Sequence, residues 1–173
     1  MPIHFSDRDV ASEVEGVSSA LIVPCIMCPA ATVAVREQEP FLRLFKSLFK
    51  SAPFERYIEA LQSRLADKGV RTEVFKSRIY HQWFLCMWTG GRREKLRKRA
   101  SRHDAVIVIG CDSATETVRE AAEASGCRLI EGMKVSGIMN AQLSFQLPGD
   151  IAFESCRIVP IAGHEQETLQ HKG

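Results

Sequence analysis

Ala105–Cys111 reads AVIVIGC, and this stretch decides the fold. An unbroken apolar run without polar alternation is typical of a strand that is buried on both faces, as the central strands of parallel sheets are. Ser19–Pro24 (SALIVP) is a second run of this kind, and it ends at a proline. Each run leads directly into a cysteine, Cys111 in one case and Cys25 in the other. We therefore expect two buried strands that each end beside a thiol.

The segments between these runs predict helices and a further strand. Pro53 suits the first turn of a helix, and Gly69 stands where a C-terminal glycine cap belongs. The apolar residues between them recur at helical spacing: Phe54, Ile58, Leu61 and Leu65. Another helix is expected over Phe41–Phe49, and Val70–Phe75 (VRTEVF) alternates like a strand.

The chain after Cys111 predicts one more helix and one more strand. Ser113 and Glu116 have the spacing of a capping box, Gly126 closes the helix, and Cys127–Glu131 begins a strand. Strands that alternate with helices favour a parallel sheet joined by right-handed crossovers. The predicted fold is an α/β three-layer sandwich with a mainly parallel, flavodoxin- or Rossmann-like sheet.

The composition is that of an ordinary soluble globular chain, with 173 residues, 45% hydrophobic, 25% charged and a formal net charge of +2. These values exclude a disordered or fibrous chain, and the net charge is too small to imply a nucleic-acid partner by itself. The longest uncharged run, Ala20–Val35, contains two prolines and is shorter than the roughly 20 residues of a bilayer span. Acidic residues precede it where a secretory signal would be basic, so we expect a cytoplasmic protein. Residues 1–162 are expected to form one domain and residues 163–173 a polar tail.

The six cysteines are the main functional signal. Without an export signal they are expected to be reduced thiols that bind metal or perform redox chemistry. Ligands bind outside the carboxyl ends of parallel strands, and four cysteines fall at that edge: Cys25, Cys28, Cys86 and Cys111. Cys127 begins a strand and belongs to the opposite edge, whereas Cys156 occupies an apolar position in a predicted strand. We predict that the four thiols at the first edge are metal ligands.

Three chemistries suit these thiols. Structural zinc sites usually pair two short Cys-x-x-Cys motifs, whereas here one such pair joins two distant single cysteines, which favours a [4Fe-4S] cluster over zinc. A redox dithiol at Cys25 and Cys28 is a further alternative, because a thiolate near a helix N-terminus has a lowered pKa. The remaining alternative is a set of buried thiols without metal.

The order of these parts resembles the C-terminal domain of the iron-sulfur subunit of bacterial methylenetetrahydrofolate reductases. The resemblance spans roughly residues 8 to 145. It rests on the strand before the Cys-x-x-Cys pair, on Asp104–Cys111 with Ser113–Val118 after it, and on Gly132–Ala141, which resembles a later loop of the family. It implies a metal-binding accessory domain of one-carbon metabolism that works beside a flavoprotein, a corrinoid protein or a methyltransferase. The four cysteines at the predicted edge are the positions that carry over. The family has another cysteine where this chain has Ala30, Ala31 and Thr32, so a second cluster is not expected.

Aromatic residues surround Cys86 in the sequence. Trp83, Phe84 and Trp88 would exclude water from a cluster, or they belong to the core. His81 is interpreted as a structural histidine, with metal ligation or proton donation as the alternatives.

The basic run Arg92–Arg102 is interpreted as a solvated helix face, or as a surface for an acidic partner or an anionic cofactor tail. The candidate cofactor-binding residues are Trp83, Trp88, Arg92 and Arg93. The sequence contains no Walker loop, no Gly-x-Gly-x-x-Gly after a strand and no nucleophile elbow, which disfavours nucleotide-driven and triad chemistry. It leaves open whether the chain catalyses a reaction or forms homo-oligomers.

Overall fold

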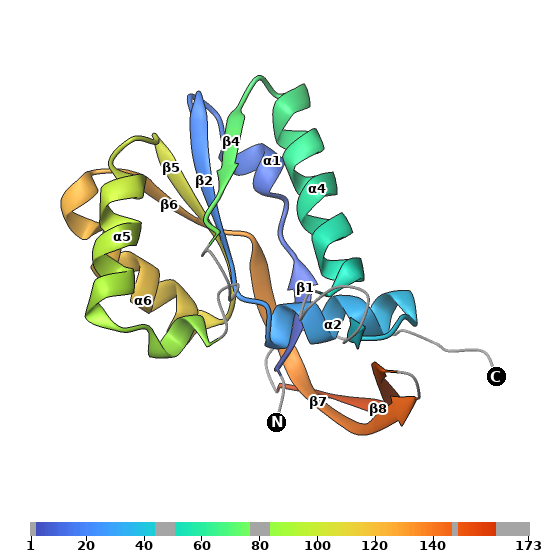
Figure 1. The fold of residues 1–173 in the computed structure, drawn as a ribbon. Coiled ribbons are helices and arrows are strands. Elements are labelled where there is room, and N and C mark those ends of the chain that lie inside the picture. The colour runs from blue at the N-terminus through green and yellow to red at the C-terminus, as the bar shows by residue number, and fades with distance from the viewer. Residues whose placement is uncertain (1–2, 44–50, 77–83, 147–148, 162–173) are drawn as a thin grey trace.

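The computed structural model describes residues 3–43, 51–76, 84–146 and 149–161 (Figure 1). The strands are β1 (Ile3–Asp7), β2 (Ser19–Pro24), β3 (Leu42–Arg43), β4 (Arg71–Val74), β5 (Ala105–Ile109), β6 (Arg128–Glu131), β7 (Met133–Gln146) and β8 (Asp150–Pro160). The α-helices are α1 (Val10–Glu13), α2 (Cys28–Glu37), α4 (Ala52–Asp67), α5 (Gly90–Ala100) and α6 (Asp112–Ala122). Two short 3-10 helices are η1 (Leu85–Met87) and η2 (Glu123–Ser125).

A parallel sheet with the strand order β4-β2-β5-β6 forms the middle layer of one part of the fold. Helix α4 covers one face, and α5 and α6 cover the other (Figure 1). Alternate residues of β2 pack in different core clusters: Ile22 with the residues of α4, and Leu21 and Val23 with those of α5 and α6. Both β2 and β5 are therefore buried on both faces, as their apolar runs predict.

A second sheet is antiparallel, with the order β1-β7-β8-β3. The chain passes from β6 through Gly132 into the long strand β7, and the β7–β8 hairpin projects from the lower end of the molecule in Figure 1. The α/β class is thus confirmed, whereas a mainly parallel fold is confirmed only in part. The comparison of Gly132–Ala141 with a loop is wrong, because most of this segment belongs to β7.

One of the two helices predicted before Val70 is confirmed, and the other is wrong where the structure describes it. Helix α4 begins with Pro53 in its first turn and buries the four predicted apolar residues. Gly69, just beyond its end, has a φ of 78°. By contrast, Leu42 and Arg43 form β3 and pair with β8, so a helix is wrong there, and residues 44–50 lie outside the described part.

The predicted capping box is also wrong. Cys111 has extended backbone angles and is the N-cap of α6, so Ser113 already lies inside the helix. Glu116 instead pairs with Arg119 at 3.0 Å. The helix itself is confirmed, and it buries Val118, Ala121 and Ala122.

Some predictions fall on residues that the structure does not describe. These are the polar tail over residues 163–173, and Trp83 and His81. Among the described residues, no helix has both the length and the apolar character that a membrane span requires.

Candidate functional site

Cys25 and Cys111 follow the two central strands of the parallel sheet, β2 and β5. The chain leaves β2 for α2, which packs in the core on the α4 side, and leaves β5 for α6 on the other side. The carboxyl ends of β2 and β5 are therefore the point where the crossovers diverge. In open α/β sheets, ligands bind at this point. Two of the four predicted ligands thus lie where the fold places a binding site.

The ends of these two strands are held close together. Pro24 of β2 pairs with Ile109 of β5, and the backbone N–H of Cys25 donates a hydrogen bond of 2.8 Å to the carbonyl oxygen of Ile109. A Cβ atom added at Gly110 would lie 3.8 Å from the Cβ atom of Cys25 and only 2.7 Å from that of Ala114. The glycine between β5 and Cys111 therefore permits the close approach of both loops.

Cys86 reaches this edge from η1. Leu85 is completely buried in the cluster that contains Cys25, whereas Cys86 is exposed. The preceding residue, Phe84, has a φ of 50°, a left-handed conformation that is uncommon for a bulky side chain. Leu85 anchors the turn, and the turn presents Cys86 to solvent.

The Cys25 thiol is the most buried of the four, with 6% of the residue exposed. Burial raises the pKa of Cys25 to about 11, hydrogen bonds from the backbone N–H groups of Leu85 and Met27 oppose this rise, and nearby Cys28 and Cys111 add to it. Without a metal, this group is therefore a neutral thiol at neutral pH. The two amide donors are placed to stabilise a thiolate once a cation compensates for its burial.

The remaining thiols are close enough to act on one another. Burial raises the pKa of Cys86, and so do Cys111 and Cys28, against the effect of the backbone N–H of Cys86 itself. Cys25 and Cys86 thus each interact with both Cys28 and Cys111. The structure brings together all four cysteines that the strand-end argument selects.

These sulfur atoms do not surround a single point. Within residues 3–43, 51–76, 84–146 and 149–161, no group of three or more His, Cys, Asp or Glu side chains is arranged to hold a metal ion. The sulfurs of a tetrahedral zinc site lie about 3.8 Å apart, because each Zn–S bond is about 2.3 Å. The four thiols are neighbours without that compact arrangement.

The other two cysteines lie elsewhere. Cys127 precedes β6 at the amino edge of the parallel sheet, and its Sγ atom is 2.9 Å from Ser125 Oγ. Cys156 belongs to β8 of the antiparallel sheet and packs against the core on the α4 side. Burial alone raises its pKa, so no other thiol acts on it.

Among the described candidates for cofactor binding, Trp88 borders the cysteine edge, and Arg92 and Arg93 lie in the first turn of α5 after it. Trp88 is 7% exposed and lies in the same core cluster as Cys25, and its ring is tilted against that of Phe75 with the ring centres 5.4 Å apart. The Arg92 Cζ atom lies 5.7 Å from the centre of the Trp88 ring, and Arg93 forms an ion pair with Glu120. Trp88 is therefore a core residue beside the thiols, and the two arginines lie on the surface next to it.

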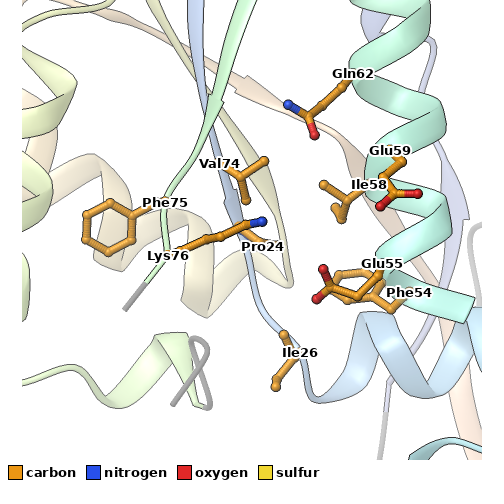
Figure 2. A pocket seen from close by; sticks show the side chains of 10 residues that line it. All are labelled: Pro24, Ile26, Phe54, Glu55, Ile58, Glu59, Gln62, Val74, Phe75 and Lys76. Atoms are coloured by element: carbon orange, nitrogen blue, oxygen red, sulfur yellow. The ribbon is translucent and has the colours of Figure 1, made fainter. Parts of the chain in front are cut away.

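A small hollow opens between α4 and the ends of β2 and β4 (Figure 2). Ile26, Phe54 and Ile58 provide its apolar wall, and Glu55 and Lys76 are among its polar side chains. Its volume is about 70 Å³, far below the ~300–1,000 Å³ of pockets that enclose a cofactor. The hollow lies on the α4 side of the Cys25 loop, whereas Cys25 itself packs on the α5 and α6 side.

Two features of the site were missed at the level of sequence. The backbone N–H of Leu85 acts on a cysteine far away in the chain, and no sequence pattern identifies such a donor. The second feature is the close approach at Gly110. The sequence did contain a signal for it, because a glycine between a buried strand and a helix indicates a close backbone approach.

Comparisons of the chain with family models, curated proteins and solved structures find no match.

Proposed function

We propose that the chain binds one [4Fe-4S] cluster through Cys25, Cys28, Cys86 and Cys111, and that it serves as an electron-transfer or accessory protein. The observation that carries this proposal is the position of Cys25 and Cys111 directly after the two central strands, at the carboxyl edge of the parallel sheet, with Cys28 and Cys86 nearby. The strand order β4-β2-β5-β6 is the order 2-1-3-4 of flavodoxin-like sheets, whose ligands bind beside the first and third strands. The candidate ligands Cys25 and Cys111 follow those two strands.

The side chains present fit a cluster. Thiolates are the ligands of iron-sulfur clusters, and hydrogen bonds to their sulfurs, together with burial, set the reduction potential. The Leu85 and Met27 amides supply such hydrogen bonds to Cys25, and buried Leu85 and Trp88 reduce access of water. A bound cluster would supply reversible one-electron chemistry. The residues around it hold the sulfurs and exclude water from one side, and only Cys86 is exposed among the four cysteines.

Two alternatives have less support. Structural zinc sites usually pair two short Cys-x-x-Cys motifs and gather their four sulfurs around one point, whereas this chain has one such pair, and the described residues contain no such group. A redox dithiol needs a thiolate, and Cys25 has its pKa raised to about 11.

The metabolic setting of the proposal rests on the resemblance of Asp104–Cys111 and of the Cys-x-x-Cys pair to the iron-sulfur subunit of methylenetetrahydrofolate reductases. The protein would then work in the cytoplasm, in one-carbon metabolism, beside a flavoprotein, a corrinoid protein or a methyltransferase. Its cluster would pass electrons to that partner or support its methyl transfer.

Anaerobic reconstitution with iron and sulfide tests the proposal. We expect a brown protein with about four irons and four sulfides per chain, as the cluster formula requires. Cys25→Ser, Cys28→Ser, Cys86→Ser and Cys111→Ser should each reduce iron content and visible absorption. The matched variants Cys127→Ser and Cys156→Ser should retain both. A colourless protein with one zinc would replace the cluster by a structural zinc site, and thiol oxidoreductase activity that survives Cys111→Ser would indicate the dithiol.

A further inference from the structure

The turn η1 forms an exposed apolar tip beside the cysteine edge. Phe84 is 45% exposed and Met87 is 70% exposed, and exposed Cys86 lies between them. Aromatic side chains, methionine and arginine are the residues enriched at the centres of protein interfaces. Cys86, the exposed cysteine of the proposed site, therefore lies between two side chains, Phe84 and Met87, that a protein partner would contact.

A basic stripe begins at this tip and runs along α5. We use this name for Arg92, Lys95, Arg99 and Arg102. The first three are spaced by three and four residues, which places them along one side of α5, and Arg102 follows in the turn after the helix. Arg92 lies over the Trp88 ring and Arg99 over the Phe75 ring, at 5.7 Å and 5.2 Å. The stripe thus rests on aromatic side chains that border the cysteine edge.

The charge of the stripe is only partly compensated. Arg99 forms an ion pair with Glu73 at 3.2 Å. Lys95 and Arg102 are exposed, and neither has a carboxylate partner within the part of the chain that the structure describes. The carboxylates of Glu94 and Glu120 pair with Arg97, Lys98 and Arg93 on the other side of α5. A positive surface therefore extends from the exposed tip.

We propose that the tip formed by Phe84, Cys86 and Met87, together with the basic stripe, is the docking surface for an acidic electron-transfer protein. This inference rests on the proposed cluster and names the class of its partner. A cluster held by the four cysteines would accept one electron from the reduced partner, so no bond would form or break, and Cys86 is the exposed cysteine on the side that the partner would contact. Electron-transfer complexes have small interfaces, and charge complementarity accelerates their encounter. A small apolar tip flanked by positive charge that is only partly compensated suits such a complex.

The test uses the full chain, reconstituted with iron and sulfide, and two acidic probes: a bacterial flavodoxin and a plant-type ferredoxin. Binding is measured by titration calorimetry at 20 mM and 200 mM NaCl. We expect Kd to rise with salt and the charge-reversal variant Lys95→Glu/Arg102→Glu to weaken binding roughly tenfold at low salt. Met87→Ser, added to the double variant, should weaken binding of the probes further and leave the visible spectrum unchanged.

A matched control variant has the same change in net charge, on the helix that covers the opposite face of the parallel sheet. Arg64→Glu/Lys68→Glu reverses two exposed charges at the end of α4, on the opposite face of the parallel sheet. We expect this variant to bind both probes within a factor of two of the wild type. Equal weakening by both double variants would overturn the inference, because binding would then follow net charge alone. Absence of probe binding at low salt, or displacement of the probes by single-stranded DNA at equal concentration, would overturn it too.

The two proposals fail in different ways. A chain that takes up no iron but binds the probes through the stripe would contradict the cluster and support the docking surface. A chain that carries the cluster and binds neither probe would contradict only the docking surface.

Discussion

The backbone N–H of Cys25 donates a hydrogen bond of 2.8 Å to the carbonyl oxygen of Ile109. This bond fixes the first residue after β2 against the last residue of β5. Because Cys111 is only two residues beyond Ile109, the bond also limits how far the two thiols can separate. Changes at the ends of these strands should therefore affect metal binding without touching a thiol.

Gly110 provides the first prediction. A Cβ atom at this position would lie 2.7 Å from the Cβ atom of Ala114, which is closer than such atoms approach. We expect Gly110→Ala to lower the free energy of unfolding by about 1–3 kcal/mol, the usual cost of overpacking, and to reduce iron retention after reconstitution. Urea unfolding and iron analysis measure the two effects.

Gly91→Ala is the matched control. No atom lies within 4 Å of a Cβ atom added at Gly91, which is in the first turn of α5. Alanine favours a helix by up to about 1 kcal/mol over glycine, so this variant should be as stable as the wild type or more stable. Equal urea midpoints for the two alanine variants would show that Gly110 is not needed for close approach.

Cys25 provides the second prediction, for the metal-free chain. Its folded-state pKa is raised to about 11, whereas an unfolded thiol titrates near ~8.5. The unfolded chain therefore loses its proton first as the pH rises. The contribution of this thiol to stability should be complete below about pH 8.5 and should be lost as the pH approaches 11.

Urea unfolding at several pH values between 7.5 and 10.5 measures this loss. Cys25→Ala should have a flatter pH profile than the wild type over this range. Cys127→Ser, which removes a thiol from the opposite edge, should keep the profile of the wild type. If Cys25→Ala also kept it, the buried thiol would not be the group that titrates.

The strands that form the candidate site could be predicted from the sequence because burial leaves a local signal. Ala20–Pro24 and Ala105–Ile109 are apolar throughout, since both faces of β2 and β5 are covered by helices. Their ends locate Cys25 and Cys111, and the strand-end rule then selects the four cysteines that the structure brings together. The helical spacing of the apolar residues in α4 is also a local signal, so this helix could be predicted as well.

The antiparallel sheet could not be predicted in this way. Ile3–Asp7 pairs with β7 across most of the chain, and short segments do not reveal such distant partners. Gly137 and Asn140 made this part of β7 resemble a loop. In the structure, however, a side chain at Gly137 would meet the Val159 carbonyl oxygen at 2.7 Å, so the glycine permits pairing with β8.

The capping box failed for a different reason. The Ser113 and Glu116 pattern is correct in spacing, but the extended backbone of Cys111 begins the helix two residues earlier. A sequence pattern cannot distinguish these two starts, because both leave the same apolar residues facing the core.

Asp104 provides the third prediction, at the amino edge of the parallel sheet. Its carboxylate accepts hydrogen bonds of 2.9 Å from the backbone N–H groups of Ser18 and Ser19, and one of 3.0 Å from Ser19 Oγ. These bonds, first that from Ser18, hold the pKa of Asp104 below its usual value. Its contribution to stability is therefore present above the pKa of the unfolded chain, ~3.9, and is lost as the pH falls through the lower folded-state value.

Asp104→Asn should accordingly be less stable than the wild type at pH 7, and the difference should shrink below about pH 4. Thermal unfolding followed by circular dichroism at pH 7 and pH 3.5 measures it. Because the proposed ligands lie at the other edge of the sheet, iron content at pH 7 should be unchanged. Loss of iron in a variant that is still folded would mean that this edge also shapes the site.

Leu96 provides the fourth prediction. It is completely buried, and it is the largest apolar side chain that α5 contributes to the cluster containing Cys25, Leu85 and Trp88. Leu96→Ala should lower the free energy of unfolding by about 2–5 kcal/mol, because the remaining charged residues of α5 do not fill the cavity. Lys95→Ala, an exposed neighbour, should change it by no more than about 0.5 kcal/mol. Since η1 directly precedes α5, Leu96→Ala should also speed alkylation of Cys25 in the metal-free chain, measured by mass spectrometry at pH 8. Equal alkylation of Cys25 in both variants would show that α5 does not hold the cysteine edge closed.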